Sequence, residues 1–181
     1  MTKRVKGLTL IELVVTLGLA TTLSLIALPH MQKFIAKQKV SADMLKLKST
    51  IETARNQAIS KKQRILICGT REEIKPNTND ALDCISDWSQ VMVIKAQGTT
   101  SQEVLHFQRL DEDYQLVKWS AFKRKPYLEL APNGFTNHQN GTLYLCHRTY
   151  TNLHRAVAIS KTGRVTISHD SANLNTKCDS W

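Results

Sequence analysis

Two hydrophobic patterns occupy the N-terminal third of the chain. Residues 8–28 form an apolar stretch in which Glu12 is the only charged residue, and about 20 such residues suffice for a membrane-spanning helix. We therefore predict a hydrophobic helix over 8–29 and an amphipathic helix over 30–62, with Pro29 bending the helix without ending it. The amphipathic part is indicated by apolar residues every three or four positions: Val40, Met44, Leu47, Ile51, Ala54 and Ala58.

From Gln63 onward the pattern changes to short runs rich in β-branched and aromatic residues. Turn sequences such as Asn133-Gly134, Asn140-Gly141 and Thr162-Gly163 separate these runs. Seven or eight strands at this spacing favour antiparallel sheets packed face to face, so residues 63–181 are expected to form a β-rich head. The candidate strands are 64–68, 90–94, 103–107, 114–119, 127–131, 142–146, 155–160 and 163–168.

The positive charge of the chain belongs mainly to this head. The whole chain has 25 Lys and Arg against 15 Asp and Glu, a net charge of +10. Removing Lys3, Arg4, Lys6 and Glu12 leaves 22 against 14, or +8, for residues 30–181. Such a surface attracts polyanions, whether nucleic acid, anionic lipid or an acidic protein. A solvated basic surface without a ligand is an equally good interpretation of composition alone.

The four cysteines fit an oxidising compartment. The simple pairing is Cys68 with Cys84, closing a polar loop, and Cys146 with Cys178, holding the C-terminal tail, although the sequence permits three pairings. A zinc site is a weaker alternative, because adjacent residues on a strand point to opposite faces and no paired C-x-x-C motif is present. Its ligands would be Cys146, His147, His169 and Cys178.

No pattern in the sequence indicates catalysis. The six histidines are scattered, and there is no nucleophilic serine motif, phosphate loop or paired-carboxylate pattern. We therefore expect no enzymatic activity and no cofactor.

Glu12 is the anomalous residue of the apolar stretch. An ionised carboxylate within a membrane is costly unless it is paired. Scission after Gly7 would create a positive α-amino group on Leu8 that could pair with Glu12 of the same or a neighbouring chain. A protonated Glu12, or one that reaches the membrane interface, is the alternative. The basic residues before Leu8 favour a cytoplasmic N-terminus.

The basic leader, the Gly7-Leu8 step and the sequence Leu8-Thr9-Leu10-Ile11-Glu12 before an apolar span resemble the type III signal of type IV pilins and type II secretion pseudopilins. The resemblance implies a leader at 1–7, cleavage between Gly7 and Leu8 by a prepilin peptidase, and N-methylation of Leu8. It also implies that Glu12 neutralises the N-terminus of an adjacent subunit during filament assembly. The family usually begins with Phe or Met, whereas this mature chain would begin with Leu8.

The cysteine pattern resembles one group within that family. Cys68 on the first strand, Cys84 before Trp88, Pro132-x-Gly134 before the late strands and Gly163-Arg164 near the end are similar to the FimT/GspH minor pilins and pseudopilins. The implied α+β fold is a lollipop, with a long kinked N-terminal helix and a C-terminal antiparallel β-sandwich head. Group members with four cysteines pair them as in the simple pairing above.

FimT-like members of the group bind DNA through a Gly-Arg-x-Arg loop. The corresponding residues here are Gly163-Arg164-Val165-Thr166, so Thr166 replaces the second arginine. If Val165 and Ile167 face the core, residues 164 and 166 face solvent together. The Thr162-Gly163 turn places Lys161 close to Arg164, and we expect Arg155 and Lys177 to lie near them if a Cys146–Cys178 bond holds the tail against the late strands. These cations would add phosphate contacts, and Lys123-Arg124-Lys125 forms a second basic cluster. Trp181 could stack on a base or pack back on the head.

The sequence thus predicts a minor type IV pilin that binds double-stranded DNA without sequence specificity, for uptake in natural transformation. The alternative is a structural minor pilin or GspH-like type II secretion pseudopilin that primes assembly at a filament tip. Expected partners are other pilins or pseudopilins, the prepilin peptidase and the inner membrane. The chain would cross that membrane once with its head in the periplasm, and then join a surface pilus or a periplasmic pseudopilus. The sequence does not distinguish these two machines.

Overall fold

The computed structural model of the chain describes residues 9–71, 84–97, 101–110, 113–169 and 171–181. The chain divides into two compact units, Met1–Gln38 and Lys39–Trp181. We call the second unit the head unit and describe each unit by itself. Helix α1 (Leu10–Ser60) includes residues of both units, and its backbone remains helical through Pro29, as the sequence predicted.

The first unit consists of the N-terminal part of α1. Among the described residues, no single helix has both the length and the apolar composition needed to cross a membrane; the segments Leu10–Leu25 and His30–Ser60 meet that requirement together as a bent pair. Large apolar side chains are exposed along this part of the helix. They include Leu10, Ile11, Leu13, Val14, Leu17, Leu23, Met31 and Phe34.

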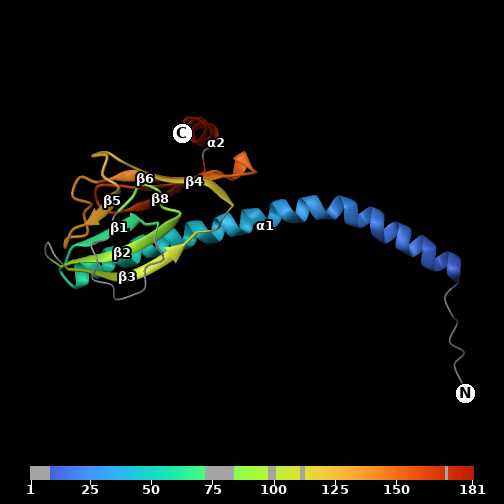
Figure 1. The fold of residues 1–181 in the computed structure, drawn as a ribbon, viewed down its shortest axis with the longest axis horizontal. Helices are drawn as coiled ribbons and strands as arrows, with labels where there is room; N and C mark the ends of the chain where they lie inside the picture. The colour runs from blue at the N-terminus through green and yellow to red at the C-terminus, as the bar shows by residue number, and fades with distance from the viewer. Residues whose placement is uncertain (1–8, 72–83, 98–100, 111–112, 170) are drawn as a thin grey trace, which may run out of the picture. The chain divides into compact units, whose positions relative to one another are not determined.

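Two antiparallel four-stranded sheets make up most of the head unit (Figure 1). Sheet A has the strand order β3-β2-β1-β5 and sheet B the order β4-β6-β7-β8. All eight predicted strands are present in the described part of the chain, with small shifts at their ends. Their bounds are β1 (Ile65–Gly69), β2 (Gln90–Gln97), β3 (Ser101–Arg109), β4 (Tyr114–Ala121), β5 (Tyr127–Leu130), β6 (Gly141–His147), β7 (Arg155–Ile159) and β8 (Val165–Ser168).

The residues buried in the head unit are those predicted from the helical repeat of α1 and from alternation along the strands. The predicted stripe of α1 is fully buried from Val40 to Ala58, because a repeat of 3.6 residues keeps it on one face. Strand residues alternate, so that Leu143 and Leu145 are buried while Tyr144 is only half-buried. Trp88 stacks on Trp119 with ring centroids 4.8 Å apart. Trp88 also donates its backbone N–H to Val117 at 2.8 Å, which links the β1–β2 connection to sheet B.

Two short helices were not predicted. The 3-10 helix η1 (Thr151–Leu153) lies in the β6–β7 connection, and α2 (Ser171–Asp179) follows β8. The sequence of α2 is polar and carries few strong helix formers. Its position depends on burial of Leu174 and on the disulfide at Cys178, neither of which is a local sequence signal.

Candidate functional site: a basic end of the head unit

The turn between β7 and β8 presents two of the predicted DNA contacts. Ser160 donates its N–H to the Arg164 carbonyl at 3.0 Å, and Gly163 donates to the Ser160 carbonyl at 2.9 Å. Gly163 has a φ of +74°, a conformation that glycine adopts without steric cost. Lys161 and Arg164 are both exposed on this closed turn. Within the described ranges, neither side chain has an acidic partner.

Alternation along β8 follows the prediction. Val165 is buried and Ile167 half-buried, whereas Arg164 and Thr166 are exposed. Residues 164 and 166 therefore share the solvent face, and this face carries one guanidinium where the Gly-Arg-x-Arg pattern would place two.

A second turn packs against the first and brings in a cation that the sequence analysis did not select. Thr136 donates its backbone N–H to the Lys161 carbonyl at 2.9 Å. Arg55 of α1 donates from Nε to the Gly134 carbonyl at 3.1 Å. A Cβ atom added to Gly163 would lie 2.8 Å from the same Nε atom. The half-buried Arg55 guanidinium therefore lies between the two turns, next to the residue that precedes Arg164.

The register of sheet B places the second basic cluster at the same end. Gly141 pairs with Ala121 of β4 on one side and with Ile159 of β7 on the other. Neighbouring strands lie about 4.8 Å apart, so the turns that leave β4 and β7 start roughly 10 Å apart. Lys123, Arg124 and Lys125 therefore leave the sheet beside the 160–164 turn, and all three are exposed.

The C-terminal end of α1 completes this surface. A Cβ atom at Gly134 would lie 2.7 Å from Cδ1 of Ile59, so the second turn packs on the last turns of α1. Exposed Lys61 and Lys62 follow directly. We call the whole set the basic end, which consists of Arg55, Lys61, Lys62, Lys123, Arg124, Lys125, Lys161 and Arg164.

One carboxylate lies within this region and is already engaged. Glu129 accepts hydrogen bonds from Asn137 and Gln139, each at 3.3 Å, and its Oε1 lies 4.0 Å from Nε of Arg64. Glu129 is half-buried and also attracts the ammonium group of Lys125, whereas Lys161 and Arg164 have no acidic partner in the described part of the chain. The basic end can therefore act as an anion-binding surface by charge alone.

Lys125, like Arg55, has a hydrogen-bond partner in the head unit. Its Nζ donates to the Tyr127 hydroxyl at 2.9 Å. This hydrogen bond is the main cause that raises the pKa of Lys125 above its usual value, and the negative charge of Glu129 raises it further. Lys125 is therefore charged at any physiological pH.

Arg155 is not brought together with Lys161 and Arg164. It pairs with Leu145 at the opposite end of β7 from Ile159, about 13 Å away at 3.3 Å per residue. Its Nη1 donates to the carbonyls of Asn152 and His154 at 3.0 and 2.7 Å, and burial lowers its pKa. The expectation that Arg155 lies near Lys161 and Arg164 is therefore wrong, because Arg155 is at the opposite end of β7 from their turn.

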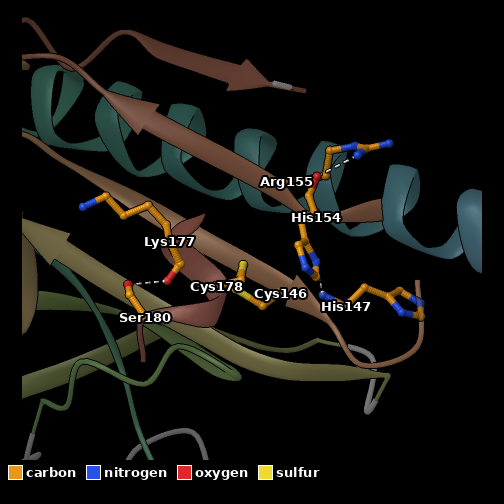
Figure 2. The surroundings of a disulfide bond; sticks show 7 residues. All are labelled: Cys146, His147, His154, Arg155, Lys177, Cys178 and Ser180. Atoms are coloured by element: carbon orange, nitrogen blue, oxygen red, sulfur yellow. Dashed lines mark hydrogen bonds between the residues drawn. A yellow bond between two sulfur atoms is a disulfide. The ribbon is translucent and has the colours of Figure 1, made fainter. Parts of the chain in front are cut away.

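Lys177 lies on a different surface again. It belongs to the last turn of α2 and, with Thr142, Ala158 and Ser168, lines a groove on the outer face of sheet B. Figure 2 shows Arg155 and Lys177 on opposite sides of the Cys146–Cys178 disulfide, with their side chains pointing apart. Lys177 is thus lateral to the basic end and near the exposed face of Thr166, which pairs with Ala158.

Both disulfides of the simple pairing are present. Cys68 bonds to Cys84, and Cys146 bonds to Cys178. The zinc alternative is thereby overturned, since the sulfur atoms of Cys146 and Cys178 are used in a covalent bond. The second bond fixes α2 against β6.

Two buried imidazoles lie beside this disulfide. Nδ1 of His154 accepts the backbone N–H of His147 at 2.9 Å (Figure 2). Nδ1 of His147 accepts the N–H groups of Thr149 and Tyr150 at 3.1 and 3.2 Å. Both acceptors require the unprotonated nitrogen. Burial is the main cause that lowers the pKa of His154 below its usual 6.5.

Trp181 packs back on the head unit. Its ring makes an edge contact with Tyr144 at 5.1 Å, and Nζ of Lys118 lies 4.2 Å from its centroid. The ring lies on the outer face of sheet B and is separate from the basic end.

The N-terminal site is described in part. Gly7 and Leu8 lie outside the described residues. Thr9 accepts the backbone N–H of Glu12 on its Oγ1 at 3.3 Å, the arrangement of a helix N-cap. Glu12 is exposed in the first turn of α1, where the helix dipole favours a negative charge.

The comparisons with known proteins agree with the fold. Residues 44–163 match the family described as type II transport protein GspH. Two crystal structures of the Pseudomonas aeruginosa type IV minor pilin FimU have a similar fold, with TM-scores of 0.56 and 0.52 at 17% identity. The alignments cover 77% and 73% of this chain and 94% of each FimU chain. The comparison with curated protein sequences found no significant match.

Proposed function

This chain belongs to the GspH family of type IV pilin-like proteins, and on that premise we propose that it is a minor pilin that binds DNA through the basic end. The family and fold are those of structural pilins, which function by assembling with other pilins into a filament. The finer proposal is uptake of double-stranded DNA in natural transformation, with the head in the periplasm and a final place in a surface pilus.

The observation that carries DNA binding is the position of Arg55. The sequence offers a single arginine in the Gly163-Arg164-Val165-Thr166 loop, which would be a weak phosphate grip. Arg55 reaches the same two turns from α1 through its 3.1 Å hydrogen bond to Gly134. Arg55, Lys161 and Arg164 thus supply three cations around one rigid pair of turns.

Phosphate neutralisation explains how such a surface would bind. Each contacted phosphate releases counterions. The logarithm of the binding constant therefore falls by about 0.9 per contact for each tenfold increase in salt concentration. Contacts by Arg55, Lys161, Arg164 and one flanking lysine predict a slope of about −3.6. Contacts of this type fix position on the duplex and carry no sequence information.

Anisotropy of a labelled duplex, titrated with the full chain in detergent at several salt concentrations, tests this proposal. Lys161→Gln and Arg164→Gln should each make the slope shallower by about one. Lys46→Gln is the matched control, because this exposed lysine lies on α1 about 20 Å from Lys61 at 1.5 Å per residue. Absence of binding at low salt would contradict DNA binding.

Assembly requires the N-terminal part of the proposal. We propose that the prepilin peptidase cleaves between Gly7 and Leu8 in the inner membrane and that Leu8 is then N-methylated. The new amino group would pair with Glu12 of a neighbouring subunit. Mass spectrometry of the mature chain tests the cleavage, and Glu12→Ala should prevent incorporation into filaments. Normal assembly of Glu12→Ala would contradict the pairing.

The alternative function is a structural minor pilin or type II secretion pseudopilin that primes assembly without DNA. Thr166 favours it, because this exposed position carries no second arginine. Under this alternative, charge substitutions at the basic end would alter the filament count while duplex binding by the wild-type chain would be absent.

A further inference from the structure

Two exposed phenylalanine rings lie among the cations of the basic end. The side chain of Phe122 is 79% exposed and that of Phe135 is 47% exposed. Single exposed apolar residues are common on protein surfaces. These two are notable because they come from different turns and lie at the same end of sheet B.

Phe135 is held on a fixed backbone. Its N–H donates to Oδ1 of Asn133 at 3.1 Å, and its carbonyl accepts the N–H of Ala131 at 2.9 Å. The next residue, Thr136, bonds to the Lys161 carbonyl. The ring therefore projects from a turn that is hydrogen-bonded to the 160–164 turn. Because this backbone is already ordered, a ligand that contacts the ring pays little entropy for ordering the turn.

Phe122 is anchored in a similar way. Its N–H donates to the Asn140 carbonyl at 3.0 Å, and Arg124 donates to the Ala121 carbonyl at 3.0 Å to close the turn. Lys123 follows the ring directly. The Ala121–Gly141–Ile159 row of sheet B places this turn beside the turn that carries Lys161 and Arg164.

Exposed aromatic rings combined with cations are the features that bind single-stranded nucleic acid. Bases stack on the rings while Lys and Arg hold the phosphates, and the stacking tolerates any sequence. A duplex gives the rings no partner along its length, because its base faces are already stacked. As stacking surfaces for bases, the rings therefore require bases that are unpaired.

We propose that the basic end binds single-stranded nucleic acid or the unpaired end of a duplex, with Phe122 and Phe135 stacking on bases. Lys161, Arg164 and Arg55 hold the neighbouring phosphates. This proposal rests on the proposed DNA-binding function and adds contacts to unpaired bases, such as those at a duplex end, to the phosphate contacts.

The test uses two probes that differ only in their bases. Anisotropy would compare the full chain in detergent with labelled oligothymidylate and with an abasic strand of the same length. The wild-type chain should bind oligothymidylate at least tenfold more tightly, because a single base–aromatic stack already corresponds to about that factor. Phe135→Ala and Phe122→Ala should reduce this preference, and the double variant should abolish it while leaving the abasic affinity unchanged.

Two controls separate stacking from general effects. Trp181→Ala removes an aromatic ring of the same 47% exposure on the outer face of sheet B, and the preference should remain. Phe135→Tyr and Phe122→Tyr retain an aromatic ring, so these variants should retain the preference for oligothymidylate. Equal affinity of the wild-type chain for the two probes would overturn the proposal, as would equal losses for both probes in the alanine variants.

The outcomes distinguish the stacking proposal from the DNA-binding function on which it rests. If Lys161→Gln and Arg164→Gln weaken duplex binding while the phenylalanine variants leave oligothymidylate binding unchanged, only the stacking proposal fails. If the wild-type chain binds neither strand nor duplex, the DNA-binding function fails as well. If the phenylalanine variants instead lose co-purification with other pilins and retain strand affinity, the rings contact a protein and the stacking proposal is overturned.

Discussion

Nε of Arg55 donates to the Gly134 carbonyl at 3.1 Å, so a helix side chain and a turn 79 residues later form one unit. Arg55 therefore has two separable roles, as a hydrogen-bond donor and as a cation. The loss of a hydrogen bond from a charged group costs about 1.5 to 3 kcal/mol, and partial exposure places Arg55→Ala near the lower limit.

Arg55→Ala should lower both stability and duplex affinity. Arg55→Lys should keep most of the affinity, because it keeps the charge, while losing stability, because an ammonium group does not reproduce the planar donor. Denaturant unfolding and duplex anisotropy measure the two effects. Full affinity in Arg55→Ala would show that this side chain is purely structural.

A second arginine at position 166 should strengthen DNA binding. Thr166 is exposed on the same face as Arg164, so Thr166→Arg places two guanidinium groups side by side. The salt slope should steepen by about one for a single added phosphate contact. Thr166→Gln controls for side-chain length, and an unchanged slope in Thr166→Arg would indicate that this face does not meet the DNA.

The buried imidazole of His154 should make stability depend on pH. The pKa of His154 is lower in the folded protein than its usual 6.5, chiefly through burial; Asp179 raises it, while His147 and Arg155 lower it further. As the pH falls through about 6.5, the unfolded chain takes up the proton first. The free energy of unfolding should therefore be constant above about pH 7.5 and decrease below about 6.5.

Denaturant unfolding between pH 5 and pH 8 measures this dependence. His154→Gln should reduce the decrease at low pH, whereas His138→Gln, which changes an exposed imidazole, should leave it intact. A His154→Gln profile as steep as that of the wild type would assign the pH dependence to other groups.

Loss of the Cys146–Cys178 disulfide should destabilise the head unit strongly. Its sequence separation of 32 residues corresponds to about 4 kcal/mol in the chain-entropy model, compared with about 3 kcal/mol for the 16-residue separation of Cys68–Cys84. The double variant Cys146→Ser/Cys178→Ser should also release α2. Hydrogen exchange of residues 171–179 measures that release, and unchanged protection would show that burial of Leu174 is sufficient to hold α2.

Most of the fold could be predicted because it follows from local periodicity. The stripe from Val40 to Ala58 and the alternation around Val165 are repeats of 3.6 and 2 residues. The 160–164 turn could be located because Gly163 is needed for a left-handed backbone conformation. Helix α2 could not, because its polar sequence has little helical preference of its own.

By itself the sequence determined the long helix, the eight strands and which face of each is buried, because backbone geometry gives helices and strands those repeats. Only the tertiary structure decided which distant segments meet. From the sequence alone, Arg55 is one polar residue on an amphipathic helix, and Arg155 is expected to lie near Lys161. Strand register and helix packing reverse those interpretations: they bring Arg55 between the two turns and hold Arg155 a strand's length away.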